Sequence, residues 1–512
     1  MRQSPIEAVN ASVAALRHIG ADVRTGAFTK DQQTLQREER YQRCSQRSDW
    51  QSETCVMNPI EITRLGLTVL AISSSVVQAQ TQAPRNITPA APPGLAISDF
   101  AVRDGDSRLK GQTIIPEAST AKPGDSGRRA HTNVRLFVPA KAEESQEAGI
   151  AAPKAAVGPP FSGFYIETPA SLACLYALVT PIAGCNPNAV TANALGGSKV
   201  VAIVDAYDNP SILTDLQRFS AQFGLPSPTA TNFQVVFAAG ARPALDNGWA
   251  LEEALDVEVV HALAPGAKII LVEAASNSYP DLMQAEDIAS SMVTAAGGRE
   301  VSNSWGGAEF SGELSYASHF NGKTNVVFFA STGDAPGVSF PSTLPSVIAV
   351  GGTSVSRNVE TGKFRQETTW ADGGGGASAY VPRPPYQDGI SGRVGDARGV
   401  PDISFDGNPN TGVWVYCGTS CGASDQGGWY IVGGTSVGSP AIAAMVNSAG
   451  GFAANSDIEH QKLYAHLGTA SFFNVNLGVC GPYAGFFTVS TNAAKLWDFC
   501  TGLGSPRGLS GL

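Results

Sequence analysis

The 512-residue chain contains only six histidines, and this scarcity limits the catalytic bases that it can use. They are His18, His131, His261, His319, His460 and His466. Only His261 lies in a segment with a suggestive helical pattern, residues 249–263. At about 100° per residue its side chain points roughly opposite that of Glu252, so we expect His261 to be a packing or surface residue. A nucleophile in this chain therefore needs a base other than histidine.

Charged residues are also few, at 15% of the chain, and the net charge at pH 7 is −10. The sequence has no basic patch with interleaved aromatic residues, which argues against nucleic acid as a partner. It has no Cys-x-x-Cys pair, which argues against a metal site built from cysteines. With 43% hydrophobic residues, the chain can bury a large core. Its apolar runs alternate with helical stretches and predict an α/β fold with a parallel sheet; the runs are 199–204, 268–274, 325–330 and 346–350.

A glycine-rich turn followed by small apolar residues, Gly433–Val446, is typical of a serine at the start of a helix. Ser436 would lie where the N-terminal amides and the helix dipole stabilise negative charge. Pro440 is acceptable in a first helical turn. The alternative is an ordinary turn between a strand and a helix, because such turns are common in α/β proteins.

An acidic pair in the helical segment provides a candidate base. Glu252 and Asp256 are one turn apart on the same helix face. Glu253 is a rival, because positions i and i+3 also share a face. Most such pairs lie on solvated helix surfaces, so the pair acquires meaning only together with Ser436.

Together, the serine turn and the acidic pair resemble the sedolisin family, serine-carboxyl peptidases with a subtilisin-like fold. The resemblance implies that Glu252 is the general base for Ser436 and that Asp256 orients Glu252. The family's Glu-x-x-Leu-Asp register selects Glu252 over Glu253. It also implies that Asp334, in the segment 330–334 after an apolar strand, stands in the oxyanion hole. Taken alone, a Gly-Asp pair at a strand end is ordinarily a turn.

The resemblance extends from about residue 162 to the C-terminus. Its pieces occur in the family's order, at 168–174, 200–205, 302–307, 340–345, 350–353 and 398–402. It implies a subtilisin-like parallel sheet flanked by helices in a peptidase domain at 162–512. Asp205 occupies the place of the triad aspartate of subtilisins and is given at most a supporting role. Trp305 resembles a family tryptophan near the acidic residues, although a half-buried aromatic residue is an equal alternative.

The chemistry of these residue types indicates action in acid. A glutamate has an ordinary pKa near about 4.3, so it is a weak base whose usefulness depends on positioning and partial desolvation. Asp334 can donate to an oxyanion only when it is protonated, which low pH, burial and neighbouring carboxylates favour. A histidine base would be charged in the same range.

The N-terminal part has the pattern of an export signal placed unusually far into the chain. Residues 57–79 combine a short polar start, a thirteen-residue apolar run at 65–77 and small residues before a cleavage point, and the run is too short to span a membrane. Met57 is the only methionine between Met1 and Met283, so we expect translation to start there and residues 1–56 to be a spurious or disordered extension. The alternative is a cytoplasmic extension before an internal anchor. Residues 80–161, rich in Pro, Ala, Ser and Gly, are expected to be a disordered or loosely ordered linker or a short propeptide remnant, with one apolar patch at 134–138.

The cysteines agree with export. Six follow the signal, and pairing of neighbours is the simplest arrangement: Cys174 with Cys185, Cys417 with Cys421 and Cys480 with Cys500. Such bonds are typical of an oxidised compartment. We therefore expect a secreted protein, extracellular or periplasmic.

The resemblance also implies a calcium site near the C-terminus. Here Asn474 puts an amide where the family has a carboxylate, followed by the carbonyl of Val475, and Asp498 remains although the family's glycines are missing. Calcium prefers six to eight hard oxygens with sufficient negative charge. We expect a degraded site with weak or absent calcium dependence.

The sequence thus predicts a secreted, acid-acting serine-carboxyl endopeptidase, a monomer that acts on protein or peptide substrates. One alternative is a lipase or esterase, which would want a Gly-x-Ser-x-Gly elbow, where Thr435 stands at the free position before Ser436, and a later histidine. The other is a catalytically inactive secreted binding protein, favoured if the four predicted catalytic residues do not converge.

Overall fold

Within the described residues, eight strands form the central sheet of the computed structural model, in the order β12-β11-β9-β7-β4-β6-β5 with β15 also paired to β11. Every pairing is parallel except that of β11 with β12. The strands are β4 (Val200–Ala206), β5 (Phe233–Phe237), β6 (Lys268–Ala274), β7 (Glu300–Asn303), β9 (Val327–Ser331), β11 (Val347–Arg357), β12 (Phe364–Thr369) and β15 (Ile403–Asp406). The predicted parallel sheet is confirmed, because continuous apolar runs suit strands that are covered on both faces.

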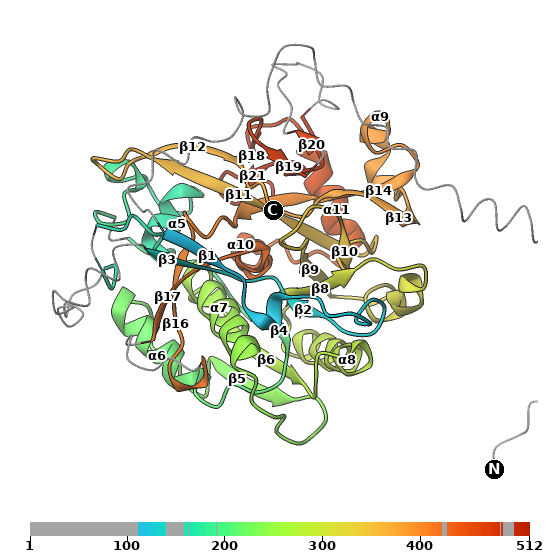
Figure 1. Cartoon of the computed structure of the whole chain (residues 1–512), viewed down its shortest axis with the longest axis horizontal. Coiled ribbons are helices and arrows are strands. Elements are labelled where there is room, and N and C mark those ends of the chain that lie inside the picture. The colour runs from blue at the N-terminus through green and yellow to red at the C-terminus, as the bar shows by residue number, and fades with distance from the viewer. Residues whose placement is uncertain are drawn as a thin grey trace, which may run out of the picture. The chain divides into compact units, whose positions relative to one another are not determined.

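The structure describes residues 111–139, 158–161, 163–190, 192–421, 428–481, 483–484 and 496–512. All of these belong to one unit, Ala90–Leu512, drawn in colour in Figure 1. The expected extension at 1–56 and the signal at 57–79 lie outside the described residues. No helix in the described ranges is both long enough and apolar enough to cross a bilayer.

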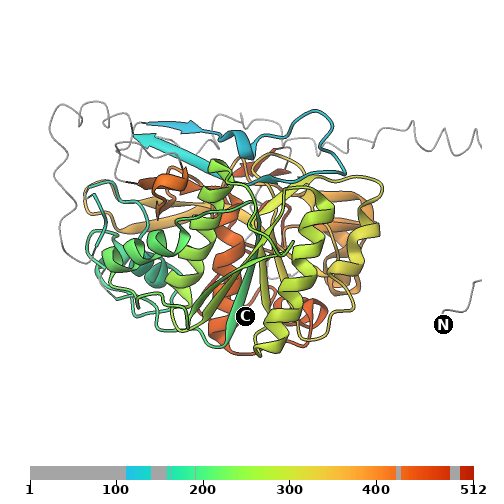
Figure 2. The ribbon, with the colours of Figure 1, turned by 90° about the horizontal axis from the view of Figure 1, so that it is seen from below.

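Helices cover both faces of the sheet, as Figure 2 shows. They are α5 (Pro169–Leu175), α6 (Ile212–Phe223), α7 (Asn247–Leu263), α8 (Tyr279–Ala295), α9 (Ser391–Val394), α10 (Gly438–Ala449) and α11 (Ser456–Ala465). Asp246 caps α7 by accepting hydrogen bonds from the backbone of Gly248 and Trp249. On one face α7 packs against α10 and α6, and on the other α8 packs against β4 and β6.

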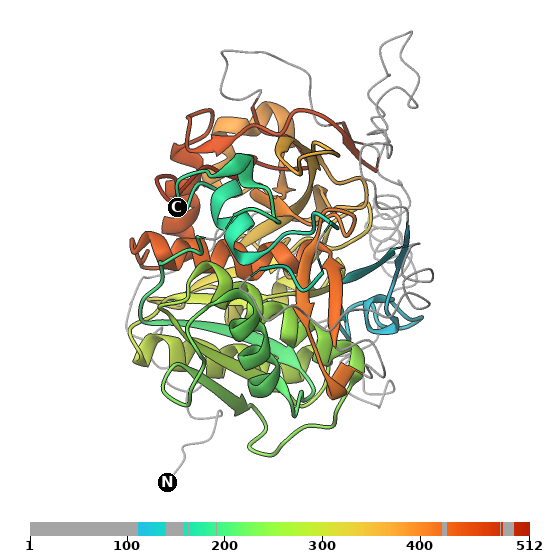
Figure 3. The ribbon, with the colours of Figure 1, turned by 90° about the vertical axis from the view of Figure 1, so that its left-hand side faces the viewer.

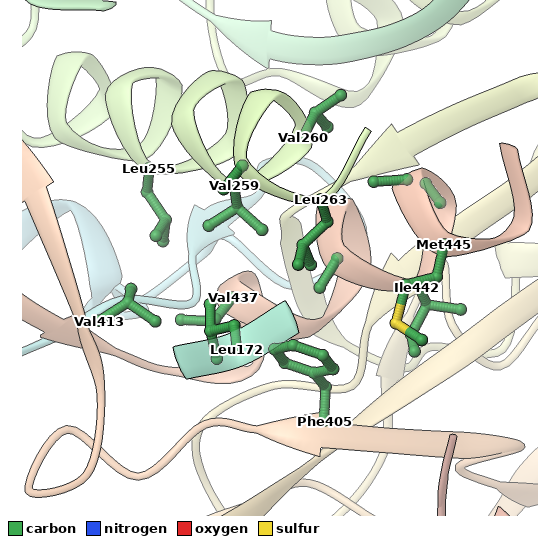
Figure 4. Packing of buried hydrophobic residues seen from close by; sticks show 14 of the residues in the cluster. Leu172, Leu255, Val259, Val260, Leu263, Phe405, Val413, Val437, Ile442 and Met445 are labelled. Carbon is green, nitrogen blue, oxygen red and sulfur yellow. The ribbon is translucent and has the colours of Figure 1, made fainter. Parts of the chain in front are cut away.

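The core between α7 and α10 is shown in Figure 4. Leu255, Val259 and Leu263 of α7 and Ile442 and Met445 of α10 belong to one cluster of buried apolar side chains. Nothing from residue 249 to residue 263 is exposed, so the acidic residues of α7 are buried together with its apolar ones. The polar side chains of this helix therefore lie within the protein and not on a solvated face.

The first described segment, residues 111–139, adds strands to the body. It forms β1 (Gly111–Ile114), the short helix η3 (Glu117–Ser119), β2 (His131–Thr132) and β3 (Arg135–Pro139). β3 pairs with β17 (Trp429–Gly433), which pairs with β16 (Val413–Tyr416), while β2 pairs with β8 (Trp305–Ala308) and β8 with β10 (Ser339–Phe340). The sequence assigned this segment to a linker or propeptide remnant. In the structure it lies across one end of the body, beside the β16–β17 hairpin (Figure 3), and its Val134 and Phe137 join the core.

Short elements complete the unit. They are the strands β13 (Gly376–Pro382), β14 (Ala397–Val400), β18 (Phe472–Phe473), β19 (Val479–Cys480), β20 (Tyr483–Ala484) and β21 (Ser505–Pro506), and the 3-10 turns η4 (Ala183–Cys185), η5 (Glu313–His319), η6 (Pro385–Ile390), η7 (Thr419–Cys421) and η8 (Thr435–Val437). Disulfides join Cys174 with Cys185, Cys417 with Cys421 and Cys480 with Cys500. These are the three expected pairings.

Candidate active site

Ser436 lies in η8, between the end of β17 and the start of α10, and is fully buried. The turn depends on Gly434, whose φ of +113° disfavours any other residue. A Cβ at Gly434 would lie 1.9 Å from the carbonyl oxygen of Asn133 and 2.7 Å from Oδ2 of Asp334. The turn therefore holds Ser436 close to a carbonyl of the first segment and to a carboxyl.

Glu252 of α7 is the carboxylate beside Ser436. The Ser436 hydroxyl donates to the backbone oxygen of Ser304 at 3.1 Å, and it also lies near enough to Glu252 to lower the pKa of that carboxyl. Because a hydroxyl has one hydrogen, these two acceptors are alternatives. Oε2 of Glu252 accepts from the backbone N–H of Asn133 at 3.2 Å. Oε1 accepts no well-aligned hydrogen bond among the described residues. Oε1 is thus available to take a proton.

Asp256 and Asp205 extend the acidic group away from the serine. Burial, then the charges of Asp256 and Asp205, raise the pKa of Glu252 well above its ordinary value. Burial likewise raises the pKa of Asp256 and of Asp205. Three carboxyls in so dry a place cannot all be ionised, so they share protons and titrate together.

Asp334 follows β9, and its two oxygens have different surroundings. Oδ1 accepts from the backbone N–H of Thr435 at 2.7 Å and from the Thr435 hydroxyl at 2.9 Å. Oδ2 has no partner among the described residues, and it lies close to the Asn133 carbonyl oxygen, on the same side of Gly434. Burial raises the pKa of Asp334 to about 7, against the lowering effect of Arg135. In acid the carboxyl is therefore neutral, and its proton belongs on Oδ2, since Oδ1 is already an acceptor twice.

The Asn133 carbonyl oxygen lies beside two groups that can donate to an oxyanion. The backbone N–H of Ser436 donates to it at 3.3 Å, and Oδ2 of Asp334 lies on the same side of Gly434. An N–H and a protonated carboxyl beside a serine hydroxyl are groups of the kind that stabilise a tetrahedral oxyanion. The structure thus places Ser436, Glu252 and Asp334 around Asn133, while Asp256 lies near enough to Glu252 to raise the pKa of that carboxyl.

The comparisons with known proteins agree with this geometry. A model of the subtilase family matches residues 237–471. Kumamolisin of Bacillus sp. (strain MN-32) is 30% identical over 357 residues, which are 61% of this chain and 59% of kumamolisin. Sedolisin of Pseudomonas sp. (strain 101) is 34% identical over 193 residues, 34% of this chain and 29% of sedolisin. Together these similarities support the sedolisin family. It spans less than two thirds of the length of either relative.

A solved structure shows that the fold is shared. The structure of Pseudomonas sedolisin, described as a serine-carboxyl proteinase complexed with two molecules of pseudo-iodotyrostatin, superposes with a TM-score of 0.52. The match is 23% identical and covers 67% of this chain and 95% of the other. At this identity the likeness concerns the fold alone.

The rival candidate residues have other neighbours. Glu253 is buried, and after burial itself the neighbours that raise its pKa are Glu273 and Asp205, not Ser436. His261 is buried and its Nε2 lies 2.8 Å from the carbonyl oxygen of Pro226, as expected of a packing residue. Trp305 is fully buried, and its indole N–H donates to the backbone of Val204 at 3.0 Å, next to Asp205.

The C-terminal residues proposed for calcium fit that ion poorly. Oδ1 of Asp498 accepts from the backbone of Cys500 at 2.8 Å and of Thr501 at 2.9 Å, and Oδ2 accepts from the Thr501 hydroxyl at 3.1 Å. The Val475 carbonyl accepts from the same hydroxyl at 3.4 Å. Burial raises the pKa of Asp498 to about 6, so in acid this oxygen ligand is neutral. Asn474 adds no charge, and calcium sites need several anionic oxygens.

Three functional positions were missed by sequence reasoning. Thr435 orients Asp334, Ser304 holds the Ser436 hydroxyl, and Asn133 supplies the carbonyl. Thr435 was considered only as the residue before Ser436 in a comparison with the lipase elbow. The one signal for the first segment was the apolar patch at 134–138, which is where β3 joins the core.

Proposed function

We propose that this chain is an acid-acting serine-carboxyl endopeptidase that hydrolyses peptide bonds through an acyl-enzyme on Ser436. The observation that carries the proposal is that Ser436 and Asp334 lie beside the carbonyl oxygen of Asn133 while Glu252 accepts from the Asn133 N–H. A nucleophile, a free carboxylate oxygen and two oxyanion donors are the parts that acyl transfer needs. The similarity of the chain to kumamolisin and sedolisin is the second support.

In the proposed reaction, Ser436 Oγ attacks the carbonyl carbon of the scissile bond and its proton passes to Oε1 of Glu252. The Ser436 N–H and protonated Asp334 stabilise the oxyanion. Collapse breaks the C–N bond, and the leaving amine takes the proton back from Glu252. Water then attacks the ester with Glu252 again as base, which releases the carboxylic acid and restores the Ser436 hydroxyl.

Acid action follows from the protonation states that this cycle requires. Asp334 must keep its proton, so activity should fall as pH rises through about 7, where its raised pKa lies. Glu252 must lose a proton, so activity should also fall at low pH, where Glu252 and the neighbouring Asp256 and Asp205 all become protonated. The test is the pH profile of kcat/KM on a denatured protein. We expect a bell with its maximum below pH 7, whereas a maximum at about pH 8 or above would contradict a carboxylate base.

The two other hypotheses receive less support. A lipase or esterase needs a histidine base, and in the described ranges no histidine is hydrogen-bonded to Ser436. An inactive binding protein has no need for a carboxyl held neutral beside a serine amide. The same substrate assay separates them, because neither alternative cleaves a protein.

We also propose that the protein is secreted. Three disulfides support an oxidising compartment. A chain beginning at Met57 should be exported and processed near Ala79, which N-terminal sequencing of the secreted protein checks. Recovery of secreted protein with residues 1–56 attached would contradict this route.

A further inference from the structure

The β16–β17 hairpin joins the helix of the candidate base to the turn of the nucleophile. Its two strands pair antiparallel, with Tyr416 opposite Trp429. β17 ends at Gly433, three residues before Ser436. One end of the hairpin therefore continues directly into the turn that holds the Ser436 hydroxyl.

The other end of the hairpin contacts the first turn of α7. Nδ2 of Asn247 donates to the backbone oxygen of Ser420, in η7, at 2.5 Å. Sγ of Cys417 lies 3.7 Å from the backbone oxygen of Ala250. The disulfide between Cys417 and Cys421 closes this turn. The closed turn thus presents a carbonyl to the start of α7.

Glu258, further along α7, makes a buried contact to the same hairpin. Its Oε2 accepts from the backbone N–H of Tyr416 at 2.9 Å, and the residue is 1% exposed. Burial raises the pKa of Glu258 well above its usual range, against the lowering effect of the Tyr416 N–H, and the charge that adds to this rise is that of Asp215. In acid, Glu258 is therefore a neutral hydrogen-bond acceptor that takes no part in the acidic group beside Ser436.

The hairpin contacts a face of α7 other than the one that carries the candidate base. At about 100° per residue, Asn247 and Glu258 lie on one face, and Glu252 is turned away from both by more than about 100°. The helix also packs against β4 and β6, where Asp205 and Glu273 are paired in register. Neither of these carboxyls accepts a well-aligned hydrogen bond among the described residues. Apolar packing is not directional, so the two hydrogen bonds from the hairpin add directed contacts that this packing does not supply.

We propose that Glu258 and Asn247 are positioning residues, which fasten α7 to the β16–β17 hairpin and so hold Glu252 at Ser436. This rests on the proposed peptidase function. Because the same hairpin leads into the Ser436 turn, the base and the nucleophile are both fixed relative to one element. A displacement of about 1 Å at a catalytic group can lower a rate by about 100-fold. Loss of either contact should therefore lower kcat more than it changes KM.

The Cys417–Cys421 disulfide belongs to the same arrangement. Cys417 directly follows β16, and its bond to Cys421 constrains the backbone at Ser420, which is the acceptor for Asn247. Loss of the disulfide should then act through the same contact as loss of the Asn247 amide. Changes that act through one contact are not additive.

The first experiment compares two variants of Glu258 on a dye-labelled denatured protein at about pH 4, where Asp334 is protonated. Glu258→Gln keeps an acceptor oxygen for the Tyr416 N–H and should retain kcat within about twofold. Glu258→Met removes the acceptor and should lower kcat by about 10-fold, with KM within about twofold. Glu459→Met, which removes a buried carboxyl from α11, is the control and should keep the wild-type kcat.

Each variant is assayed well below its own measured Tm, so that unfolding does not contribute. A wild-type kcat in Glu258→Met would overturn the role of Glu258. An equal loss of kcat in Glu258→Gln and Glu258→Met would overturn it as well, because the amide still accepts the hydrogen bond.

The second experiment removes the contact at the start of α7. Asn247 is exposed, so Asn247→Ala should fold, and it should lower kcat by about 3- to 10-fold with little change in KM. Asn193→Ala is the matched control, because Nδ2 of Asn193 also donates to a backbone oxygen, that of Phe223, at 2.8 Å. A wild-type kcat in Asn247→Ala would overturn the role of Asn247.

The third experiment removes the disulfide. Cys417→Ser with Cys421→Ser should lower kcat by a factor similar to that of Asn247→Ala, and adding Asn247→Ala should cost little more. Cys174→Ser with Cys185→Ser is the control, which should lower the Tm and keep kcat. Losses that multiply in full would overturn the link between the disulfide and Asn247. If the wild type cleaves the protein and every variant keeps its kcat, the positioning proposal fails and the proposed function stands, whereas a wild type that cleaves nothing overturns both.

Discussion

Thr435 donates two hydrogen bonds to a single oxygen of Asp334, from its backbone nitrogen at 2.7 Å and from its hydroxyl at 2.9 Å. The other oxygen is thereby turned towards the space beside Gly434, where the Asn133 carbonyl lies. Because burial raises the pKa of Asp334 to about 7, that second oxygen carries the proton in acid. Thr435 therefore positions a donor without touching the carbonyl through its own side chain.

The first prediction concerns this donor. Asp334→Ala should lower kcat by about 10² to 10³ in acid, the usual loss when one oxyanion donor is removed. Asp334→Asn should lose less, because an amide can accept from Thr435 with its oxygen and donate with its nitrogen at every pH. Its activity should therefore persist above pH 7, where the wild type declines. Steady-state kinetics from pH 3 to pH 9 check this. If the activities of the wild type and Asp334→Asn decline identically above pH 7, the proton on Asp334 does not have the proposed role.

The second prediction concerns the nucleophile and its base. Ser436→Ala and Glu252→Gln should each abolish peptide cleavage and leave the far-UV circular dichroism unchanged. The double variant should be little worse than either, because residues of one catalytic unit are not additive. Glu253→Gln is the matched control, since it removes a buried carboxyl from the same helix whose pKa is raised, after burial, chiefly by the charge of Glu273. Should Glu253→Gln prove inactive and Glu252→Gln active, the roles assigned to the two neighbours would have to be exchanged.

The third prediction concerns stability against pH. Burial raises the pKa of Asp334, Glu300 and Glu313 to about 7 in the folded protein. Groups whose folded pKa is raised contribute stability that is complete below the unfolded pKa, about 4, and is lost as pH rises through the folded value. We expect the Tm to be highest near about pH 4 and to fall by more than about 5 °C by pH 8.

Arg398 sets the acid limit of this stability. It pairs with Asp402, 2.5 Å away, and holds the pKa of that buried carboxyl well below its usual range. The stability from Asp402 is present above the unfolded pKa and is lost only in strong acid. Calorimetry on Ser436→Ala, which avoids self-digestion, measures both limbs. Glu300→Gln should reduce the fall of the Tm between pH 4 and pH 8. A Tm that rises steadily over this range would contradict the assignment of buried neutral acids.

The fourth prediction concerns calcium. Removal of calcium with a chelator should change the Tm by less than about 2 °C, because Asp498 already satisfies a turn and Asn474 contributes no charge. Asn474→Asp is the informative variant, since it restores a second carboxylate and should increase any response to calcium. A large drop in the wild-type Tm on chelation would show that Asn474, Val475 and Asp498 still frame a working site.

The sequence was sufficient for elements whose signals are local. Apolar runs predicted the parallel strands, and the helical spacing at 249–263 lies within α7. Neighbouring cysteines were correctly paired, because short loops bring their chain ends together. The four candidate catalytic residues came from a resemblance, since spacing alone left Glu252 and Glu253 equivalent.

The course of residues 129–136 could not be predicted in the same way. Arg-Ala-His-Thr-Asn-Val-Arg-Leu has neither helical nor alternating periodicity. Its strand conformation arises from pairing with β8 and β17, which are distant in the sequence. Burial of the acidic residues of α7 also depends on such tertiary packing. Periodicity therefore suggested a partly solvated helix, whereas residues 249–263 are buried in the structure.

The covalent connection of residues 129–136 to the body makes this segment a competitor present at a fixed, high effective concentration. A short tether typically corresponds to about millimolar ligand, so a dissolved peptide at micromolar concentration cannot displace it.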